Sequence, residues 1–426
     1  MTEAQKPASK KVVVVGQGYV GLPLAMRAVE VGHTVVGFDT DEARIKRLAA
    51  GESFVEDVPP DVVVAALESG RYQATSEAKD CAGFDVAVIT VPTPLREGTP
   101  DLSYIEASAL TMARFLRPGA TVVLESTTYP GTTEELVGPI LEEQSGLVAG
   151  TDFHLGYSPE RIDPGNPAWN LVNTPKVVSG IDAASLSAVT AFYDTIVDRT
   201  VAVSTPKEAE LTKLLENTFR HVNIALVNEL AMFAADLGIN VWEAIDAAST
   251  KPFGYMRFTP GPGVGGHCLP IDPSYLSWRV KRTLGQSFRF VELANDVNDH
   301  MPDYVVRRLM QALNRDKKAV NGSRILLLGL AYKRNTSDDR ESPAHTIAER
   351  LLSLGAEVRA ADPHVNLAYV DGRVVRVECT SEEVAAADAV VLITDHDDFD
   401  YDMVAANAGY VLDTRNRLRG DHVEPL

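Results

Sequence analysis

Cysteine is scarce in this chain. Only Cys81, Cys268 and Cys379 occur among 426 residues, and they lie far apart. Three separated cysteines do not make the paired framework of a disulfide-stabilised domain. Neither a CxxC pair nor an HExxH motif is present, so we expect no dedicated metal site.

Long apolar runs are missing as well. No stretch approaches the ~18 apolar residues that a membrane span needs. The first residues, MTEAQKPASKK, contain no apolar segment of signal-peptide length. We therefore expect a cytoplasmic location and no membrane partner.

Basic charge is in deficit. The chain has 40 Lys and Arg against 59 Asp and Glu, which gives a net charge of −19. A nucleic-acid backbone binds basic surfaces, so we expect no nucleic-acid partner. The binding of a small anionic ligand is compatible with this net charge, because local cations and helix N-termini decide such binding. The hydrophobic share of 45% and the charged share of 23% are typical of a soluble globular protein, here long enough for two or three domains.

The first strong motif follows a run of four valines at 12–15, which predicts a buried parallel strand. Gly16, Gly18 and Gly21 come next in the spacing GxGxxG, and an amphipathic segment follows. In a dinucleotide-binding turn these glycines make the turn, admit a pyrophosphate and let the helix pack closely. The helix N-terminus offers free N–H groups to the phosphates. Tyr19 and Val20 complete this predicted cofactor loop.

Asp39 ends the second predicted strand, HTVVGFDTD. A carboxylate there accepts both ribose hydroxyls and repels a 2′-phosphate, so NAD is the expected cofactor. Arg44 lies nearby and is included in the cofactor site, and it keeps NADP as an alternative. An isolated GxGxxG also occurs in ordinary tight turns, but here strand, helix, second strand and acid are all in place.

Two further strands are predicted within FDVAVITVPTPL (84–95) and TVVLESTTYPGTTEEL (121–136). Ligands of open α/β sheets lie outside the carboxyl ends of the strands. We therefore place Pro92 and Thr93 at the cofactor, and Thr127 within reach of its nicotinamide end. The alternative for Thr127 is a helix-cap or turn hydroxyl.

The middle of the chain predicts one long helix from Pro206 to about Leu237, stopped by Gly238, and a short helix after it. Lys213 and Asn217 are one turn apart on one face, among leucines that we expect to be buried. The alternative for Lys213 is an ordinary solvated helix lysine. The apolar positions at helical spacing are Leu211, Leu214, Leu215, Phe219, Ile224, Leu226, Val227, Leu230 and Phe233.

The stretch PGPGVGGHCLPIDPSYLSW (260–278) surrounds Cys268 with glycine and proline, beside His267 and four residues before Asp272. Such glycine density indicates positive φ angles or a close approach to a ligand. A thiol is a strong nucleophile when a cation or helix N-terminus activates it. From the residues alone, a nucleophile, a packing role and a metal ligand all stay open for Cys268.

The last hundred residues repeat the strand–loop–helix–strand order, with Asp362 after the second strand. Their first turn lacks GxGxxG and carries Lys333, Arg334 and Arg340 instead. These cations suit a phosphate or carboxylate, and a solvated charge run is the alternative.

The predicted fold is α/β, with two Rossmann-like, doubly wound parallel-sheet domains joined by a helical middle domain with a long central helix. We place an NAD-binding domain at 1–203, a helical domain at 204–312 and a second α/β domain at 313–426.

The chain resembles nucleotide-sugar 6-dehydrogenases of the UDP-glucose and UDP-N-acetylhexosamine type. The matching stretches run in family order over nearly the whole sequence and are VVGQGYVGLPLA, VPTPL, ESTTYPGTT, YSPERIDPGN, AELTKLLENTFRHVNIALVNE, PGPGVGGHCLPIDP and GLAYKRNTSDDRESP. The resemblance implies oxidation of a primary alcohol to a carboxylate with two NAD+.

The resemblance also implies roles for the residues. Cys268 would capture the aldehyde as a thiohemiacetal, which a second oxidation turns into a thioester. Lys213 and Asn217 would stabilise the oxyanion, and Asp272 would orient or deprotonate water with help from Thr127. The remaining implied substrate-binding residues are Glu160, Arg161, Gly265, Lys333, Arg340 and Arg257, the last reaching into a neighbouring subunit of a homodimer or higher homo-oligomer.

Two departures concern the substrate. Glucose-type enzymes carry a GFGGSC-like loop, where this chain has GVGGHC, and a second glutamate where this chain has Pro164. The resemblance therefore favours UDP-GlcNAc or UDP-ManNAc over UDP-glucose. A single-step NAD dehydrogenase and a non-catalytic nucleotide-sugar binder are the alternatives of other classes.

Overall fold

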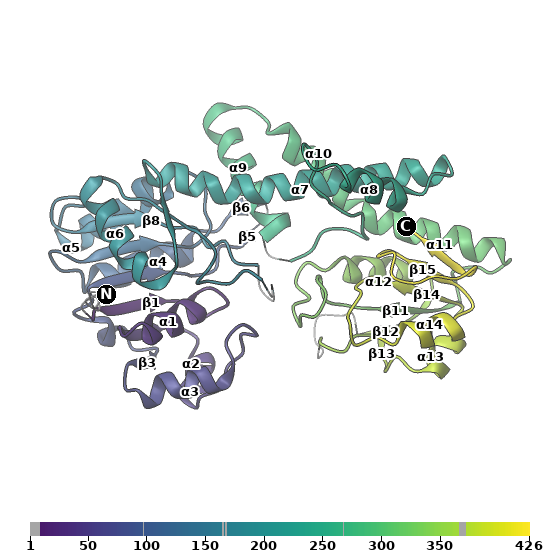
Figure 1. The fold of residues 1–426 in the computed structure, drawn as a ribbon, viewed down its shortest axis with the longest axis horizontal. Coiled ribbons are helices and arrows are strands. Elements are labelled where there is room, and N and C mark those ends of the chain that lie inside the picture. The colour runs from purple at the N-terminus through teal and green to yellow at the C-terminus, as the bar shows by residue number, and fades with distance from the viewer. Residues whose placement is uncertain (1–8, 97, 164–165, 167, 267, 366–371) are drawn as a thin grey trace. The chain divides into compact units, whose positions relative to one another are not determined.

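The computed structural model describes residues 9–96, 98–163, 166, 168–266, 268–365 and 372–426. The side chain of Cys268 also lies outside the description. Two compact units divide the chain, residues 1–216 and residues 217–426. Each is described by itself below (Figure 1).

The first unit is built on a six-stranded parallel sheet with the order β3-β2-β1-β4-β7-β8. Val12, Val13 and Val14 are fully buried, which confirms the predicted buried strand. The strands are β1 (Lys11–Val15), β2 (Thr34–Phe38), β3 (Tyr72–Thr75), β4 (Val86–Ile89), β7 (Thr121–Leu124) and β8 (His154–Tyr157).

Helices cover both faces of this sheet. Leu22 of α1 (Gly21–Glu30), Val63 of α3 (Pro60–Glu68) and Phe192 of α6 (Ala183–Ile196) pack into one apolar cluster. Ile105 of α4 (Ser103–Ala113) and Leu141 of α5 (Gly138–Ser145) pack into the other. The remaining elements are α2 (Glu42–Ala49), η1 (Ala78–Cys81), the π-helical turn η2 (Thr133–Val137), the antiparallel pair β5 (Leu95–Arg96) and β6 (Thr99–Pro100), and the parallel pair β9 (Lys176–Val178) and β10 (Thr200–Ala202).

The second sheet repeats the strand order of the first, as β13-β12-β11-β14-β15-β16. Counted from its own first strand, each sheet reads 3-2-1-4-5-6, the order of dinucleotide-binding folds. This repetition confirms the predicted pair of doubly wound domains. The strands are β11 (Arg324–Leu328), β12 (Glu357–Ala361), β13 (Val375–Arg376), β14 (Ala389–Leu392), β15 (Val411–Asp413) and β16 (Val423–Pro425).

Helices flank this sheet too. Leu309 of α11 (Met301–Arg315) and Ile347 of α12 (Pro343–Ser353) pack on one face. Val384 of α13 (Ser381–Ala386) and Val404 of α14 (Tyr401–Asn407) pack on the other. The helical region before the sheet consists of α8 (Val241–Ser249), α9 (Cys268–Leu284) and α10 (Arg289–Asp299).

The long helix α7 runs from Pro206 to Asp236 and crosses the boundary between the two units. Gly238 follows with φ of 69°, and α8 begins at Val241, so the predicted long helix, its stop and the short helix are confirmed. None of the described helices combines the length and apolar character that a membrane crossing requires.

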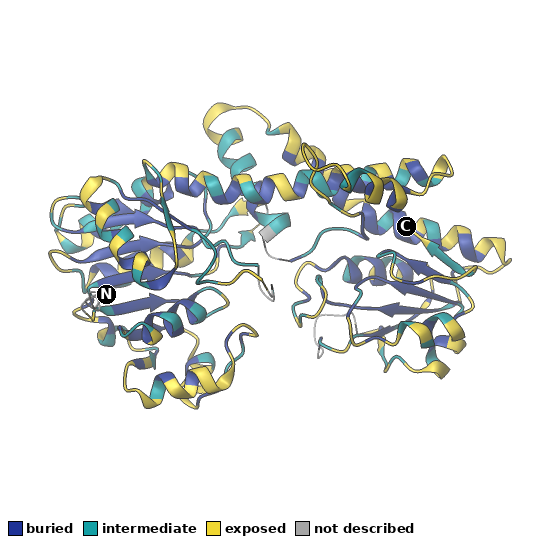
Figure 2. Ribbon diagram, viewed as in Figure 1, coloured by how far each residue is buried: buried dark blue, intermediate teal, exposed yellow. Residues whose placement is uncertain are grey.

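The prediction that the leucines of α7 are buried is wrong for one side of the helix. Leu214 is fully buried, but Leu215 is 63% exposed. Figure 2 shows exposed positions recurring along α7, and on this side Phe219 makes an edge contact with Phe258, with ring centroids 5.8 Å apart. The exposed apolar residues of this side are Leu211, Leu215, Phe219, Leu226, Leu230 and Phe233.

Candidate active site

The glycine turn after β1 has the geometry that dinucleotide binding requires. Gly16 has φ of 92°, a left-handed conformation, and its N–H donates to Phe38 O at 2.8 Å. A Cβ on Gly21 would lie 1.8 Å from Gly16 O, so only glycine lets α1 begin there. A Cβ on Gly18 would meet nothing within 4 Å, which leaves the backbone there accessible to a ligand.

The N-terminus of α1 carries no side-chain cap. Val20 stands at the cap position, no hydrogen bond from a side chain covers the first turn, and the first turn contains no acidic residue. Uncapped N–H groups at a helix N-terminus attract anions such as a pyrophosphate. Tyr19, beside Val20, is 42% exposed. The turn and the helix start therefore fit a dinucleotide.

Asp39 lies directly after β2 and is almost fully buried. Its carboxylate accepts hydrogen bonds from Gln17 N at 2.8 Å and Asp41 N at 2.9 Å. Arg44 donates to the same carboxylate at 2.8 Å. The structure thus brings the two predicted ribose-end residues, Asp39 and Arg44, into one ion pair beside the glycine turn.

Residues after β4 and β7 lie side by side, because these strands are neighbours in the sheet. The Ser126 hydroxyl donates to Val91 O at 2.8 Å. Of the predicted residues there, Thr93 is buried, Thr127 is half-buried and Pro92 is exposed. Thr90 was not predicted. Its hydroxyl lies 2.9 Å from both Val15 O and Gly16 O, which ties the end of β4 to the glycine turn.

Glu160 follows β8 and belongs to a buried charged cluster. Its Oε1 accepts the N–H groups of Arg161 at 2.6 Å and Ile162 at 2.7 Å. The Lys176 ammonium lies 3.4 Å from its Oε2 and also pairs with Glu125, the residue after β7. We call Glu125, Glu160 and Lys176 the buried charge cluster.

The pKa values of this cluster diverge. Burial raises the pKa of Glu125, and Lys176 offsets only part of that effect. Burial acts in the same direction on Glu160, but Lys176, the two backbone N–H groups and Lys213 together hold the pKa of Glu160 below its usual value. Burial would lower the pKa of Lys176, yet the two carboxylates raise it.

Two other predicted residues of the first unit lie near Glu160. Lys213 is buried in α7, which argues against the solvated-lysine alternative, and its charge acts on Glu160. Arg161 turns to Glu216, donating from Nε at 2.9 Å and Nη2 at 2.6 Å. In this structure the Arg161 guanidinium is therefore engaged by a carboxylate of its own chain.

In the second unit, Asn217 and Asp272 lie together. The Asn217 amide donates to Asp272 Oδ2 at 2.6 Å, and Asp272 is 1% exposed. Cys268 is the first residue of α9, so it lies at a helix N-terminus, and Asp272 is one turn further on. The Cys268 side chain and His267 fall outside the described atoms.

The glycine loop before Cys268 packs against the segment after β11. Gly266 N donates to Arg340 O at 2.9 Å. A Cβ on Gly265 would lie 2.7 Å from Glu341 O and 2.8 Å from the Cβ of Tyr332. Within this unit the predicted residue Gly265 thus lies beside the segment that carries Lys333 and Arg340.

The predicted cations of the second unit make contacts of their own. Arg340 is exposed, and its guanidinium forms two hydrogen bonds with Asp338, at 2.9 and 2.7 Å. Arg257 is exposed and pairs with Asp246. Lys333 is half-buried. The second unit therefore holds its cations close to the glycine loop, except for Arg257.

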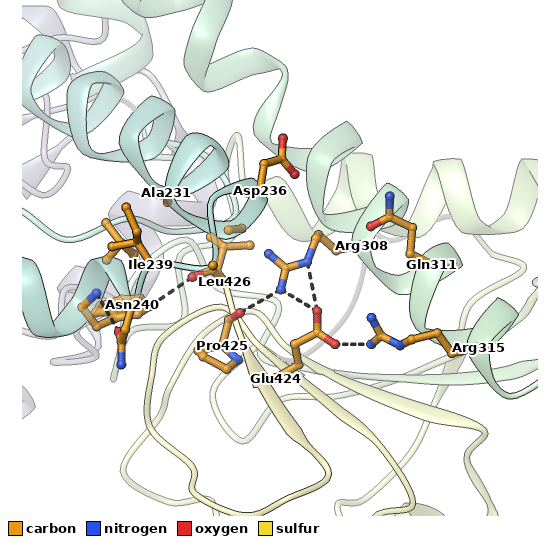
Figure 3. A pocket seen from close by; sticks show the side chains of 14 residues that line it. Ala231, Asp236, Ile239, Asn240, Arg308, Gln311, Arg315, Glu424, Pro425 and Leu426 are labelled. Carbon is orange, nitrogen blue, oxygen red and sulfur yellow. Dashed lines mark hydrogen bonds and ion pairs between the residues drawn. The ribbon is translucent and has the colours of Figure 1, made fainter.

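A cavity of about 410 Å³ also lies in the second unit, between the end of α7, α8, α11 and β16 (Figure 3). No predicted site residue lines it. Glu424 accepts hydrogen bonds from both Arg308 and Arg315, and Trp242 Nε1 donates to Leu426 O at 3.2 Å. Because Glu424 engages both guanidinium groups, we regard this cavity as part of the structural packing.

Sequence reasoning missed the partners of Glu160. Glu125 lies within the quoted stretch ESTTYPGTT, directly after a buried strand, and that position is a usable signal. Lys176 is the first residue of a three-residue strand, and no sequence motif around it indicates a functional role. Tyr193 donates its hydroxyl to Glu125 at 3.1 Å and reads in sequence as an ordinary core aromatic.

Taken together, a glycine turn with an acid after β2 and a second doubly wound domain define an NAD-dependent dehydrogenase of two α/β domains. Models of the UDP-glucose/GDP-mannose dehydrogenase family match residues 10–197 (NAD binding domain), 207–300 (central domain) and 326–420 (UDP binding domain). The chain belongs to this family. It is an NAD-dependent UDP-sugar dehydrogenase, an oxidoreductase that acts on a CH–OH group.

Individual relatives extend over nearly the whole chain. A UDP-N-acetyl-D-mannosamine dehydrogenase of Pyrococcus horikoshii is 36% identical over 91% of this chain and 90% of its own. A UDP-N-acetyl-D-glucosamine 6-dehydrogenase of Pseudomonas aeruginosa is 37% identical over 91% of each. The solved structure of a UDP-D-ManNAc dehydrogenase from Pyrococcus horikoshii has a TM-score of 0.88 at 34% identity, covering 97% of this chain and 98% of that one.

Proposed function

We propose that this protein oxidises the C6 alcohol of a UDP-N-acetylhexosamine, UDP-GlcNAc or UDP-ManNAc, to the uronate in two steps. The observation that carries the proposal is the hydrogen bond between Asn217 of α7 and Asp272, which lies one turn after Cys268 in α9. A nucleophilic thiol with a buried carboxylate and amide one turn away suits capture of an aldehyde and its later hydrolysis.

Cys268 carries the covalent chemistry in this proposal. Its thiolate adds to the C6 aldehyde made by the first oxidation, and the oxyanion takes a proton to give a thiohemiacetal. Loss of the hydroxyl proton and transfer of a hydride from C6 to NAD+ would then give a thioester. Water then attacks, the C–S bond breaks, and the carboxylate leaves while the thiolate is restored. The position at the start of α9 supports this role, because helix N-termini stabilise thiolates.

The neighbouring polar groups divide the remaining work. Lys213 and Asn217 supply positive charge and an N–H donor to the oxyanion that develops on C6. Asp272 orients or deprotonates the hydrolytic water, and Thr127 helps to hold that water. Glu160 lies between cofactor and sugar and accepts a proton as the alcohol is oxidised.

The cofactor would be held by the glycine turn, with its pyrophosphate at Gly18 and the start of α1 and its adenosine ribose at Asp39. The cofactor loop would be completed by Gly16, Tyr19, Val20, Gly21, Arg44, Pro92 and Thr93. Bound NAD+ supplies the hydride acceptor for both oxidations.

The sugar nucleotide would be held mainly by the second unit. Lys333 and Arg340 bind its diphosphate, which requires Arg340 to exchange its Asp338 partner for the phosphate. Gly265 leaves room beside the sugar, and Arg161 contributes from the first unit. Arg257 reaches the site of a neighbouring subunit. The division of the chain at 1–203, 204–312 and 313–426 remains part of this proposal.

The N-acetyl sugar is favoured over glucose by the loop GVGGHC and by Pro164, where glucose-type enzymes carry a second glutamate. The names of the mannosamine and glucosamine relatives support the same choice. UDP-glucose is the second candidate substrate.

A substrate panel tests the proposal. UDP-Glc, UDP-GlcNAc, UDP-ManNAc and UDP-GalNAc are each supplied with NAD+ while NADH is followed by its absorbance. We expect turnover with UDP-GlcNAc or UDP-ManNAc. Turnover with UDP-glucose alone would contradict the choice of sugar, and tight UDP-sugar binding without NADH would favour a non-catalytic binder.

Cys268→Ser tests the covalent step. The variant should bind the UDP-sugar as the wild type does and lose uronate formation by about 100-fold or more, because a hydroxyl is a much weaker nucleophile at neutral pH. Cys379→Ser is the matched control, since Cys379 packs in the second sheet's own apolar cluster. Uronate formation by Cys268→Ser at the wild-type rate would refute the covalent role.

A further inference from the structure

The buried charge cluster of the first unit contains more carboxyl groups than cations. Side-chain exposures are 0% for Glu125, 3% for Lys176 and 13% for Glu160. Lys176 is the ammonium that pairs directly with both carboxyl groups, and Lys213 acts only on Glu160 and less strongly. An ionised carboxylate that shares its cation is costly in a region that water hardly reaches, and in proteins such a group usually retains a proton.

The surroundings indicate which carboxyl group retains that proton. Glu160 accepts two backbone N–H groups and is also acted on by Lys213. Glu125 Oε1 accepts the hydroxyl of Tyr193 and also pairs with Lys176, while its Oε2 has no hydrogen-bond partner among the described residues. Donors that stabilise an ionised carboxylate are therefore concentrated on Glu160, and Glu125 is the poorer site for a negative charge.

We propose that Lys176 and Glu125 are positioning residues for Glu160, which keep its carboxylate ionised and fixed while the cluster's one proton stays on Glu125. The inference rests on the proposed function, in which Glu160 accepts a proton from the sugar alcohol. Because Glu125 is neutral in this arrangement, the charge of the shared Lys176 ammonium stabilises the carboxylate of Glu160.

No other described cation replaces Lys176. The Arg161 guanidinium is directed to Glu216 and to Pro175 O, although its backbone N–H bonds Glu160. Lys213 acts on Glu160 less strongly than Lys176 does. The groups that face Glu160 are Lys176 from β9, Glu125 from the end of β7, Tyr193 from α6, Lys213 from α7, and the backbone N–H groups of Arg161 and Ile162.

The proposal predicts different effects for its two residues. Glu125→Gln replaces a neutral carboxyl group by a neutral amide, so the pKa of Glu160 should stay near its wild-type value. In Lys176→Met the pKa of Glu160 rises. The acidic limb of the kcat/KM profile should therefore stay in place in the first variant and move up, by about one pH unit or more, in the second. Lys176→Arg should restore the wild-type limb, and Glu160→Gln should remove it.

Lys176→Met leaves two carboxyl groups buried without a cation and can fail to fold. The double variant Glu125→Gln/Lys176→Met leaves Glu160 as the one carboxyl group of the cluster and is compared with Glu125→Gln alone. We expect the acidic limb to lie about one pH unit higher in the double variant, which is about a tenfold lower kcat/KM at a pH below both limbs. Identical limbs would overturn the proposal.

A second readout does not depend on turnover. Carboxyl ¹³C resonances of glutamate-labelled protein are titrated, and those of Glu125 and Glu160 are assigned by their loss in the Gln variants. The pKa of Glu160 measured in this way should rank the variants in the same order as the acidic limb does. Glu125 should be protonated at neutral pH. If the Glu160 titrations follow this order but no sugar yields NADH, the proposed function is contradicted and the inference stands. If the enzyme turns over but the pKa of Glu160 is the same in all variants, the inference is overturned and the proposed function stands. An ionised Glu125 at neutral pH would have the same consequence.

Discussion

At the scale of single residues, two aspartates in equivalent positions show how one fold supports two tasks. Asp39 follows β2 of the first sheet, and Asp362 follows β12 of the second. Asp362 is completely buried and accepts the Leu330 and Ala331 N–H groups and His396 Nε2. Its carboxylate is occupied by its own chain, whereas Asp39 lies beside an open glycine turn.

The pKa of Asp362 reflects that occupation. Burial would raise it, but the hydrogen bonds from His396 and the backbone hold the pKa of Asp362 far below its usual value. This side chain therefore stabilises the fold of the second unit. The turn before it lacks GxGxxG, so the dinucleotide-binding signature belongs to the first turn.

Asp39→Ala should weaken NAD+ binding by about tenfold or more, about 1.4 kcal/mol, because the ribose hydroxyls lose their acceptor. UDP-sugar affinity should not change. Removal of the carboxylate also releases Arg44, so NADP+ should be used relatively better. Calorimetric titration of each ligand measures this. Asp41→Asn is the control, since Asp41 caps α2. Equal losses for both ligands would show that the glycine turn is misassigned.

At the scale of elements, the glycine turn offers a matched pair of substitutions. Gly18→Ala places a Cβ in open space, so the thermal midpoint should stay near the wild-type value while NAD+ binding falls. Gly21→Ala places a Cβ 1.8 Å from Gly16 O and should destabilise the first unit by about 1–3 kcal/mol. Thermal unfolding and NAD+ titration of both variants test this. A destabilised Gly18→Ala or an unaffected Gly21→Ala would contradict the description of the turn.

The start of α7 is tied to the turn before η2 by Glu210. This buried carboxyl accepts Gly131 N at 2.6 Å, Thr133 N at 2.9 Å and the Thr133 hydroxyl at 2.7 Å. Burial outweighs these hydrogen bonds and raises the pKa of Glu210 from 4.5 to about 7. The α7 segment that carries Lys213 is thus fixed by a group that titrates near neutral pH.

This pKa predicts a pH dependence. Between pH 4.5 and about 7 the native state keeps the Glu210 proton while the unfolded chain releases it, so stability falls as pH rises through this window. The loss amounts to at most about 3 kcal/mol. The stability of the wild type relative to Glu210→Gln, measured by denaturant unfolding, should therefore decrease from pH 4.5 to 7. A constant or increasing difference would show that the ionised carboxylate is the native form.

The elements were largely predictable, and the reason is local. The valine run, the GxGxxG turn, the long helix and the Gly238 stop each depend on neighbouring residues, which the sequence displays directly. The buried charge cluster was not predictable, because Glu125, Glu160 and Lys176 meet only when three strand ends are brought together. The exposure of one side of α7 was missed because periodicity identifies an apolar face without identifying what covers it.

At the scale of the whole molecule, the exposed apolar side of α7 supports the proposed homodimer or higher homo-oligomer. Its residues recur at steps of three, four or seven, so they share one face of the helix. Contiguous apolar surface of this kind marks interaction sites. We expect a mass of at least twice the 46.1 kDa of the chain.

The double variant Leu226→Glu/Leu230→Glu places two charges on that side and should lower the mass to that of one chain, because a charged group is strongly disfavoured in an apolar interface. Light scattering after gel filtration measures the mass. Glu243→Lys is a control that changes the charge of an exposed residue of α8 and leaves the exposed apolar side of α7 unchanged. A wild-type protein that elutes as a single chain would contradict the oligomer proposal.

The central claim is a four-electron oxidation completed on one sulfur. The most direct measurement supplies a limiting amount of the accepted UDP-N-acetylhexosamine with excess NAD+ and counts NADH against the uronate formed. The account predicts two NADH for each uronate and no free aldehyde. One NADH for each sugar consumed, with an aldehyde or ketone as the product, would contradict it.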